Sequence, residues 1–306
     1  MKHSLLLWLA LWAVGTQAQE FGTRWISHPM PDSVSQIWFR KTFVSKEQPL
    51  MAQLTVTSTG CLDVYVNECN VSNTLISLNR HAPSDVPITR TFDISHLLKS
   101  DSNTIALWYA PSYPHIEHHQ VAVVYSGKDR QGRNFAHLSD ESWLCRPANR
   151  TLDFCGSETQ DGYTDSAPWN ATSVHIALWQ GAKKGRGHTG YGKIPRDASA
   201  GQERAIRIRT PKYFDLVGDS IYYEFGEPFY GFLRATLRDC KKGEVIHFGN
   251  FEYICNGKTD EQAFPKFARF FGKRILVYGD KWFKREQIQR LEIVEVTIAN
   301  DSETNY

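Results

Sequence analysis

Short runs of alternating apolar and polar residues dominate the chain beyond its first twenty positions. The pattern is clearest in 222–243, YYEFGEPFYGFLRATLRDCKKG, where Tyr222–Phe225 predicts one strand and Phe229–Leu237 predicts the next. Between them, Gly226-Glu227-Pro228 predicts a tight turn. Gly231 predicts a bulge or a close approach of another backbone. This segment indicates antiparallel β-sheet.

The same alternation recurs on both sides of this segment. The further predicted strands include Ala52–Ser58, Leu62–Asn67, Asn103–Trp108, Val121–Tyr125 and Glu244–Phe248. Asn67-Glu68 lies where a hairpin would turn. Aromatic residues make up 13% of the chain, and Gly, Pro, Asn and Asp separate the runs. The pattern predicts an all-β fold of two antiparallel β-sandwich, jelly-roll-like domains.

The chain divides by composition into a leader, two domains and a polar tail. Residues 1–18 have a basic start, an apolar core shorter than a membrane span and a cleavage site at Thr16-Gln17-Ala18, which predicts a signal peptide. We expect β-sandwiches over 21–180 and 193–298. A Gly- and Lys-rich linker, 181–192, would separate them, and 299–306 would form the tail. The alternative for 181–192 is a basic loop that meets an acidic glycan.

Charge and hydropathy narrow the classes of partner. Lys and Arg number 35 against 33 Asp and Glu, so neither nucleic acid nor an anionic membrane is indicated as a partner. After the leader, no segment is long and apolar enough for a spanning helix. We therefore expect an exported protein, periplasmic or secreted, without a membrane span.

Six cysteines fall in three sequence-local pairs. Disulfides 61–69, 145–155 and 240–255 are compatible with export, although six cysteines allow about 15 connectivities and several could be buried free thiols. No pair has zinc-ligand spacing, so no metal site is predicted from cysteine. Glu224, Glu227 and Glu252 could bind calcium or sugar, although charged turn residues are usually only solvated.

Several ordered motifs resemble one enzyme family. They are Trp38-Phe39-Arg40-Lys41, Phe92-Asp93-Ile94-Ser95 with Leu97-Leu98, Asn103-Thr104-Ile105-Ala106, Asp140 with Trp143, and Glu224–Arg234 followed by Lys242-Gly243. Together they resemble the accessory N-terminal β-sandwich domains of bacterial α-L-rhamnosidases. The catalytic carboxylates of that family lie on an (α/α)6 barrel, and no long helical repeat is present in this sequence. The resemblance therefore implies no rhamnosidase activity by the family's own mechanism.

Two hypotheses for function follow. The first is non-catalytic binding of rhamnose- or uronate-containing oligosaccharides from plant or algal polysaccharide, some modules of this kind using calcium. The residues expected to contact the sugar are Trp108, Tyr109, Tyr163, Tyr230 and Arg234, because aromatic rings stack on sugar faces. The alternative is that these aromatic residues have a structural role and pack in the core or against neighbouring strands.

The second hypothesis is an enzyme of polysaccharide degradation that acts by β-elimination on a uronic acid, a lyase or an oligosaccharide dehydratase. Such chemistry needs a base, an acid and a cation that neutralises the carboxylate. The candidate catalytic residues are Tyr113, His115 and His119 in one loop and Arg80 and His81 in another. The alternative is that the loop with Tyr113, His115 and His119 has no catalytic role and is only solvated or binds metal adventitiously. A third hypothesis, a truncated gene, predicts poor folding of the second domain.

Overall fold

The structure is a computed structural model, and it describes residues 24–71, 87–112, 119–163, 168–186, 196–197 and 202–299. Within these ranges the regular structure is β-strand with three short 3-10 helices, Ser95–Leu97, Ile176–Leu178 and Arg285–Gln287. The strands up to residue 200 are β1 (Trp25–Ser27), β2 (Ser35–Val44), β3 (Met51–Ser58), β4 (Cys61–Val66), β5 (Cys69–Asn70), β6 (Ile88–Asp93), β7 (Ser102–Ala110), β8 (Gln120–Lys128), β9 (Asn134–Leu138), β10 (Leu144–Leu152), β11 (Glu158–Asp161), β12 (Gln180–Gly181), β13 (Lys183–Lys184) and β14 (Arg196–Asp197).

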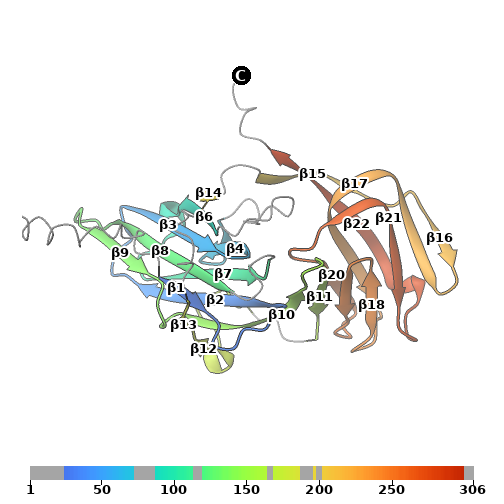
Figure 1. Cartoon of the computed structure of the whole chain (residues 1–306), viewed down its shortest axis with the longest axis horizontal. Helices are drawn as coiled ribbons and strands as arrows, with labels where there is room; N and C mark the ends of the chain where they lie inside the picture. Colours follow the sequence, from blue (N-terminus) through green and yellow to red (C-terminus); the bar gives the residue numbers. More distant parts are fainter. Residues whose placement is uncertain are drawn as a thin grey trace, which may run out of the picture.

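The later strands are β15 (Gln202–Arg209), β16 (Tyr213–Val217), β17 (Ser220–Arg238), β18 (Val245–Phe248), β19 (Phe251–Ile254), β20 (Asp260–Ala263), β21 (Phe270–Gly279) and β22 (Ile288–Ala299). The predicted all-β fold with antiparallel-rich, sandwich-like sheets is therefore confirmed. Figure 1 shows two β-units side by side, with β10 and β11 running between them.

The first unit is a sandwich whose two layers face one core. One layer has the order β13-β1-β8-β3-β6, and the other contains β10-β2-β7-β4. Alternate residues of both layers point inward; Leu54 of β3, Val123 of β8 and Leu107 of β7 are at most 1% exposed. The predicted hairpin lies between β4 and β5, where Asn67 and Glu68 both have positive φ, 49° and 72°.

The second unit is organised on β17, and here one prediction is wrong. Instead of two strands joined by a tight turn at Gly226–Pro228, the chain runs as one strand of 19 residues. Its register with β21 shifts between Glu224 and Phe229, and Gly226 takes φ +82°, so the turn residues form a bulge. Pro228 is tolerated there because a bulge removes the need for its missing N–H. The close approach predicted at Gly231 is confirmed, since a Cβ there would collide with the Val294 carbonyl.

One sheet continues from the first unit into the second. β11 pairs with β10 on one side and, in parallel, with β19 on the other. Each unit nevertheless keeps its own apolar core, one within 26–182 and the other within 221–293. The first strands after residue 179, β12 and β13, pair with β10 and β1, so this part of the predicted linker belongs to the first unit. The domain limits stay a prediction.

The backbone restricts the cysteine pairs. All six cysteines are free thiols in the structure. Val66 is opposite Cys69 in the β4–β5 ladder, so Cys61 lies five residues, roughly 17 Å, further along β4. Cys145 is the second residue of β10 and Cys155 lies in the turn after the far end of that strand, so the two are separated by the length of the strand, roughly 20 Å. A disulfide needs Cα atoms within about 7 Å, so this geometry excludes 61–69 and 145–155.

Candidate functional site

The predicted catalytic loop is described at one position only. Arg80, His81, Tyr113 and His115 lie outside the described residues. His119 directly precedes β8 and is 3% exposed, with its ring centroid 5.9 Å from that of Tyr109. Burial of this imidazole places it in the interior of the first sandwich. The catalytic roles stay predictions.

The predicted sugar-contacting residues of β7 point to opposite sides of the sheet. Tyr109 is wholly buried in the first core, where its hydroxyl lies 3.2 Å from the Thr59 hydroxyl, and burial raises its pKa. Trp108 points outward, and its Nε1 donates to Gln36 Oε1 at 2.7 Å. The Trp108 ring meets the edges of neighbouring indoles, 5.5 Å from both Trp38 and Trp169. Both β7 residues are therefore packing residues in this conformation.

The other predicted contact residues lie elsewhere. Tyr163 is 54% exposed, with Lys242 Nζ 3.8 Å from its ring centroid. Tyr230 and Arg234 share the outer face of β17, where the Tyr230 hydroxyl donates to Glu203 at 3.0 Å and Arg234 Nε donates to Glu292 at 2.8 Å. The structure thus distributes the described candidates over separate places and does not assemble them into one site.

A buried ion pair joins the two units. The Glu158 carboxylate is fully buried and accepts from Arg150 Nη1 at 3.2 Å. It also accepts the backbone N–H groups of a segment of the second unit, residues 266, 267 and 268, at 2.7, 2.8 and 2.8 Å. Four donors converge on this carboxylate, so it holds residues 266–268 against the first unit. No sequence motif marked this contact, because its partners are more than 100 residues apart.

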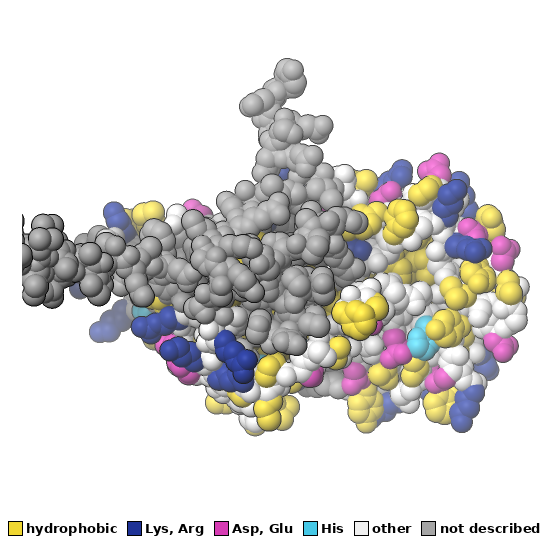
Figure 2. All heavy atoms as spheres, in the orientation of Figure 1, with side chains coloured by type: hydrophobic (Ala, Val, Ile, Leu, Met, Phe, Trp, Pro, Cys, Tyr) yellow, Lys and Arg dark blue, Asp and Glu magenta, His cyan; other side chains and the backbone are white. Residues whose placement is uncertain are grey.

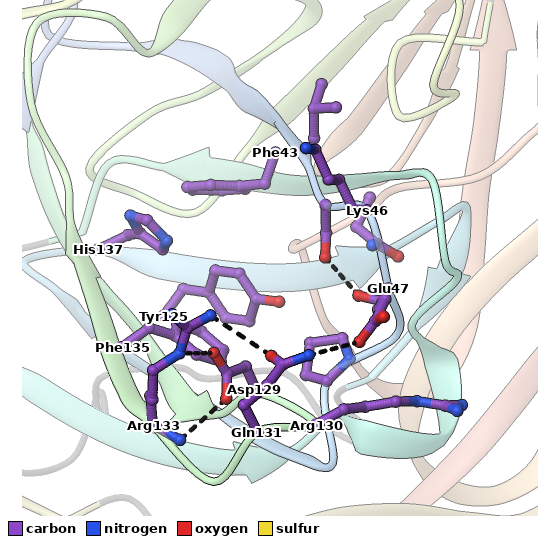
Figure 3. A pocket seen from close by; sticks show the side chains of 14 residues that line it. Phe43, Lys46, Glu47, Tyr125, Asp129, Arg130, Gln131, Arg133, Phe135 and His137 are labelled. Carbon is purple, nitrogen blue, oxygen red and sulfur yellow. Dashed lines mark hydrogen bonds and ion pairs between the residues drawn. The ribbon is translucent and has the colours of Figure 1, made fainter.

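The cavity in Figure 3 lies at one end of the first sandwich. It has a volume of about 380 Å³ and is formed by the end of β2, the segment to Pro49 and the β8–β9 hairpin. Its lining residues are Phe43, Val44, Ser45, Lys46, Glu47, Pro49, Asn103, Tyr125, Asp129, Arg130, Gln131, Arg133, Phe135 and His137. A concave surface that combines aromatic and polar groups is the usual form of a small-ligand site.

Aromatic rings form one side of this cavity. Phe43 and Phe135 each lie 5.1 Å from Tyr125, and His137 stacks on Tyr125 at 5.8 Å. Desolvation, and then the charge of Lys41, lower the pKa of His137, so its ring is neutral at neutral pH. The rings therefore present an uncharged surface that suits the C–H faces of a sugar.

The Tyr125 hydroxyl is the polar group of this wall. Figure 3 shows it directed into the cavity, and it makes no hydrogen bond to any described protein group. Burial raises the pKa of Tyr125 to about 12, so the hydroxyl keeps its proton at neutral pH. It can both donate a hydrogen bond to a ligand and accept one.

Charges ring the cavity, and only some are neutralised by neighbours. Arg133 Nε donates a hydrogen bond to Asp129 at 2.8 Å. Desolvation raises the pKa of Asp129, but the hydrogen bonds and the charge of Arg133 outweigh it and hold this pKa below its usual value. Gln131 donates to Glu47 at 3.1 Å. Among the described residues, Arg130 makes no ion pair and donates only to the Gln48 carbonyl, at 3.4 Å. Lys46 likewise makes no ion pair with a described residue. The rim therefore holds three cations, Lys46, Arg130 and Arg133, against the two carboxylates of Glu47 and Asp129, a net charge of one positive.

The sequence reasoning missed this cavity. None of the candidate residues taken from the sequence lies in its turn, Asp129–Gly132. The available signal was the alternation of Phe135 and His137 on a strand that follows two arginines, and it becomes specific only once β9 is known to pair with β8 beside the end of β2.

Possible metal ligands cluster at one place in the described part of the chain. The metal-ligand group found there is Cys240, Cys255 and Glu261, and its two sulfurs do not suit calcium. Glu47 and Asp129 of the cavity are already hydrogen-bonded. No described helix is sufficiently long and apolar to traverse a bilayer.

Comparison with solved structures shows the fold. The chain is similar to an α-L-rhamnosidase from Dictyoglumus thermophilum (TM-score 0.78, 16% identity, covering 92% of this chain and 36% of that one) and to one from Aspergillus terreus (0.76, 16%, 93% and 37%). It is also similar to the Streptomyces avermitilis α-L-rhamnosidase complexed with L-rhamnose (0.73, 13%, 87% and 29%). No protein-family model and no curated protein matches the sequence.

These similarities confirm the resemblance drawn from the motifs, at the level of fold. The chain spans about a third of the length of those rhamnosidases, and nearly all of it is matched. The chain is therefore a protein of two β-sandwich-type units, with the fold that is found in one portion of α-L-rhamnosidases.

Proposed function

We propose that this chain binds rhamnose- or uronate-containing oligosaccharides in the cavity of the first sandwich, without catalysing a reaction. The observation that carries the proposal is the Tyr125 hydroxyl, which faces an aromatic-lined cavity and has no hydrogen-bond partner among the described protein groups. Because this hydroxyl faces the cavity, a ligand hydroxyl can reach it and either accept a hydrogen bond from it or donate one to it. Aromatic rings beside such a group are typical of sugar sites.

The rim charges favour an acidic sugar over a neutral one. Arg130 and Lys46 carry positive charge without a described ion-pair partner, whereas Asp129 is paired with Arg133 and Glu47 is the remaining carboxylate of the rim. A uronate carboxylate would therefore meet a net positive rim. A rhamnose residue, with its methyl group and C–H faces, would pack on the rings of Phe43 and Phe135.

The fold and the predicted leader agree with this role. The related fold occurs in enzymes that act on rhamnosides, one of them solved with L-rhamnose. If residues 1–18 act as a signal peptide, the protein meets plant or algal polysaccharide fragments in the periplasm or outside the cell, as part of polysaccharide degradation.

Calorimetric titration tests the proposal. A panel of oligosaccharides with and without uronic acid is titrated into the wild type and into Tyr125→Phe and Arg130→Gln. Arg204→Gln is the matched control, since Arg204 is exposed on β15 in the other unit. We expect Tyr125→Phe to weaken binding about fivefold through one lost hydrogen bond. Arg130→Gln should weaken uronate binding about fivefold to tenfold and reduce its salt dependence.

Stability separates binding from folding in this test. Because the Tyr125 hydroxyl bonds no described protein group, Tyr125→Phe should leave the melting temperature unchanged while affinity falls. Equal affinity for the wild type and both cavity variants would overturn the site. If both cavity variants keep their affinity and Arg204→Gln abolishes binding, the binding site lies in the other unit.

The elimination hypothesis is decided in the same samples. Cleavage by β-elimination creates an unsaturated uronate that absorbs in the ultraviolet. A constant absorbance with measurable heat of binding supports the non-catalytic proposal. A rising absorbance that His115→Ala or His119→Ala stops would replace it with the lyase hypothesis.

A further inference from the structure

Two thiols of the second unit lie together in its core. Cys240 lies two residues after the end of β17 and Cys255 directly follows β19, and they are 6% and 0% exposed. Their sulfur atoms and a carboxylate oxygen of Glu261 all lie within 4.8 Å of one another. The other two sequence-local pairs are separated along their strands. This is therefore the pair of cysteines in the described chain whose backbone geometry favours a covalent bond.

The backbone around the two thiols is already fixed. The Cys255 N–H donates to the Glu244 carbonyl at 2.8 Å, and the Gly243 N–H donates to the Cys255 carbonyl at 2.8 Å. These bonds bring the turn after Cys240 against the end of β19. The two sulfurs lie within 4.8 Å of each other, and a cross-link requires this gap to close to the length of an S–S bond, about 2 Å.

The third member of the cluster is not available as a metal ligand. Glu261 accepts hydrogen bonds from the Tyr253 hydroxyl at 2.8 Å and from the N–H groups of Asn256 and Gly257 at 2.7 and 2.9 Å. Both of its oxygens are therefore in use, and it fixes the turn after Cys255. Two sulfurs alone do not complete the four-coordinate site of structural zinc.

We propose that Cys240 and Cys255 are joined by a disulfide in the mature protein. The reaction is exchange with a dithiol–disulfide oxidant: the two cysteines lose two protons and two electrons, and the oxidant's disulfide is reduced to two thiols. A mixed disulfide at one sulfur is resolved by attack of the other. Because both sulfurs are buried, exchange takes place before the second core closes.

The cross-link has a structural consequence at the join between the units. It closes the segment 240–255, which contains the hairpin β18–β19, and β19 is the strand that pairs in parallel with β11. Restricting this segment in the unfolded chain stabilises the hairpin and the continuous sheet.

Peptide mass spectrometry tests the proposal on the wild-type chain. The full chain is refolded in a buffer of reduced and oxidised glutathione, denatured with an alkylating reagent but no reductant, and digested. The proposal predicts one linked peptide pair containing Cys240 and Cys255, with the other four cysteines alkylated. Alkylation of both, or linkage to another cysteine, would overturn it. Bound metal that a chelator releases, with exposure of these two thiols, would also overturn it.

Thermal unfolding tests the consequence. The oxidised wild type should melt about 10 °C above the protein reduced with dithiothreitol, judged from a loop of this length. The double variant Cys240→Ala/Cys255→Ala should show no such difference, and Cys69→Ala/Cys155→Ala, the matched control, should behave as the wild type. A linked peptide without a melting difference would refute the stabilising role of the cross-link.

Discussion

Replacing Glu158 by Gln is the change expected to weaken the molecule most selectively, because it acts where the two units meet. Glu158 is fully buried, and the side chain of its partner Arg150 is 3% exposed. The neutral amide removes the countercharge and offers one acceptor oxygen where two received four donors. An uncompensated buried guanidinium costs about 3–5 kcal/mol.

Urea unfolding measures this cost. With a slope of about 3 kcal/mol per molar, a loss of about 4 kcal/mol shifts the midpoint downward by more than 1 M. Hydrogen exchange gives a local readout: the amides of Lys266, Phe267 and Ala268 should lose protection first, whether or not the two units unfold together. Glu141→Gln, at an exposed turn, is the control and should change stability by less than about 0.5 kcal/mol.

Two results together would contradict the role of Glu158 between the units. A change below about 1 kcal/mol for Glu158→Gln, with unaltered protection at residues 266–268, would mean that the carboxylate does not hold the two units together.

Three further outcomes are expected. Gly231→Ala should destabilise by about 2 kcal/mol or more in urea unfolding, because its Cβ meets the Val294 carbonyl; an unchanged midpoint would contradict the close approach. The pKa of Tyr125 is about 12 in the folded protein and about 10 in the unfolded chain, so its contribution to the free energy of unfolding is fully present below pH 10. That contribution falls by about 1–3 kcal/mol as the pH rises from 10 to 12. Tyr125→Phe should flatten this decline, and an identical decline in the variant would refute the prediction. Lys266→Met should destabilise by about 1–3 kcal/mol in thermal unfolding, since it leaves the buried Asp63 carboxylate without its ammonium partner; Lys258→Met, at an exposed turn, should have no effect.

The sequence predicted the positions of the strands better than the bulge that connects the two halves of β17. Alternation located β3, β4 and β7 within one or two residues and β8 within three, because inward and outward positions differ in polarity along each strand. The same rule divided β17 in two, since Gly226 and Pro228 are as typical of a bulge as of a turn. Which of these occurs depends on β21, which pairs with β17 on both sides of the bulge.

The site was harder to predict because its residues are brought together by pairing between distant strands. Trp108 and Tyr109 are adjacent in sequence, but one packs between the units and the other fills the first core. Phe43 and His137 are nearly 100 residues apart, and they meet at a cavity only through the alignment of β2, β8 and β9. Composition indicated aromatic and basic residues without indicating which would face a ligand.

Hydrogen exchange of the full chain, with and without a uronate-containing oligosaccharide, tests the central claim most directly. We predict added protection in residues 44–49 and 129–137, around the Tyr125 cavity, and less of it for Arg130→Gln at the same oligosaccharide concentration, because its affinity is lower. Protection confined to residues near Trp108 and His119, or to the outer face of β17 around Tyr230 and Arg234, would contradict it and place the sugar elsewhere.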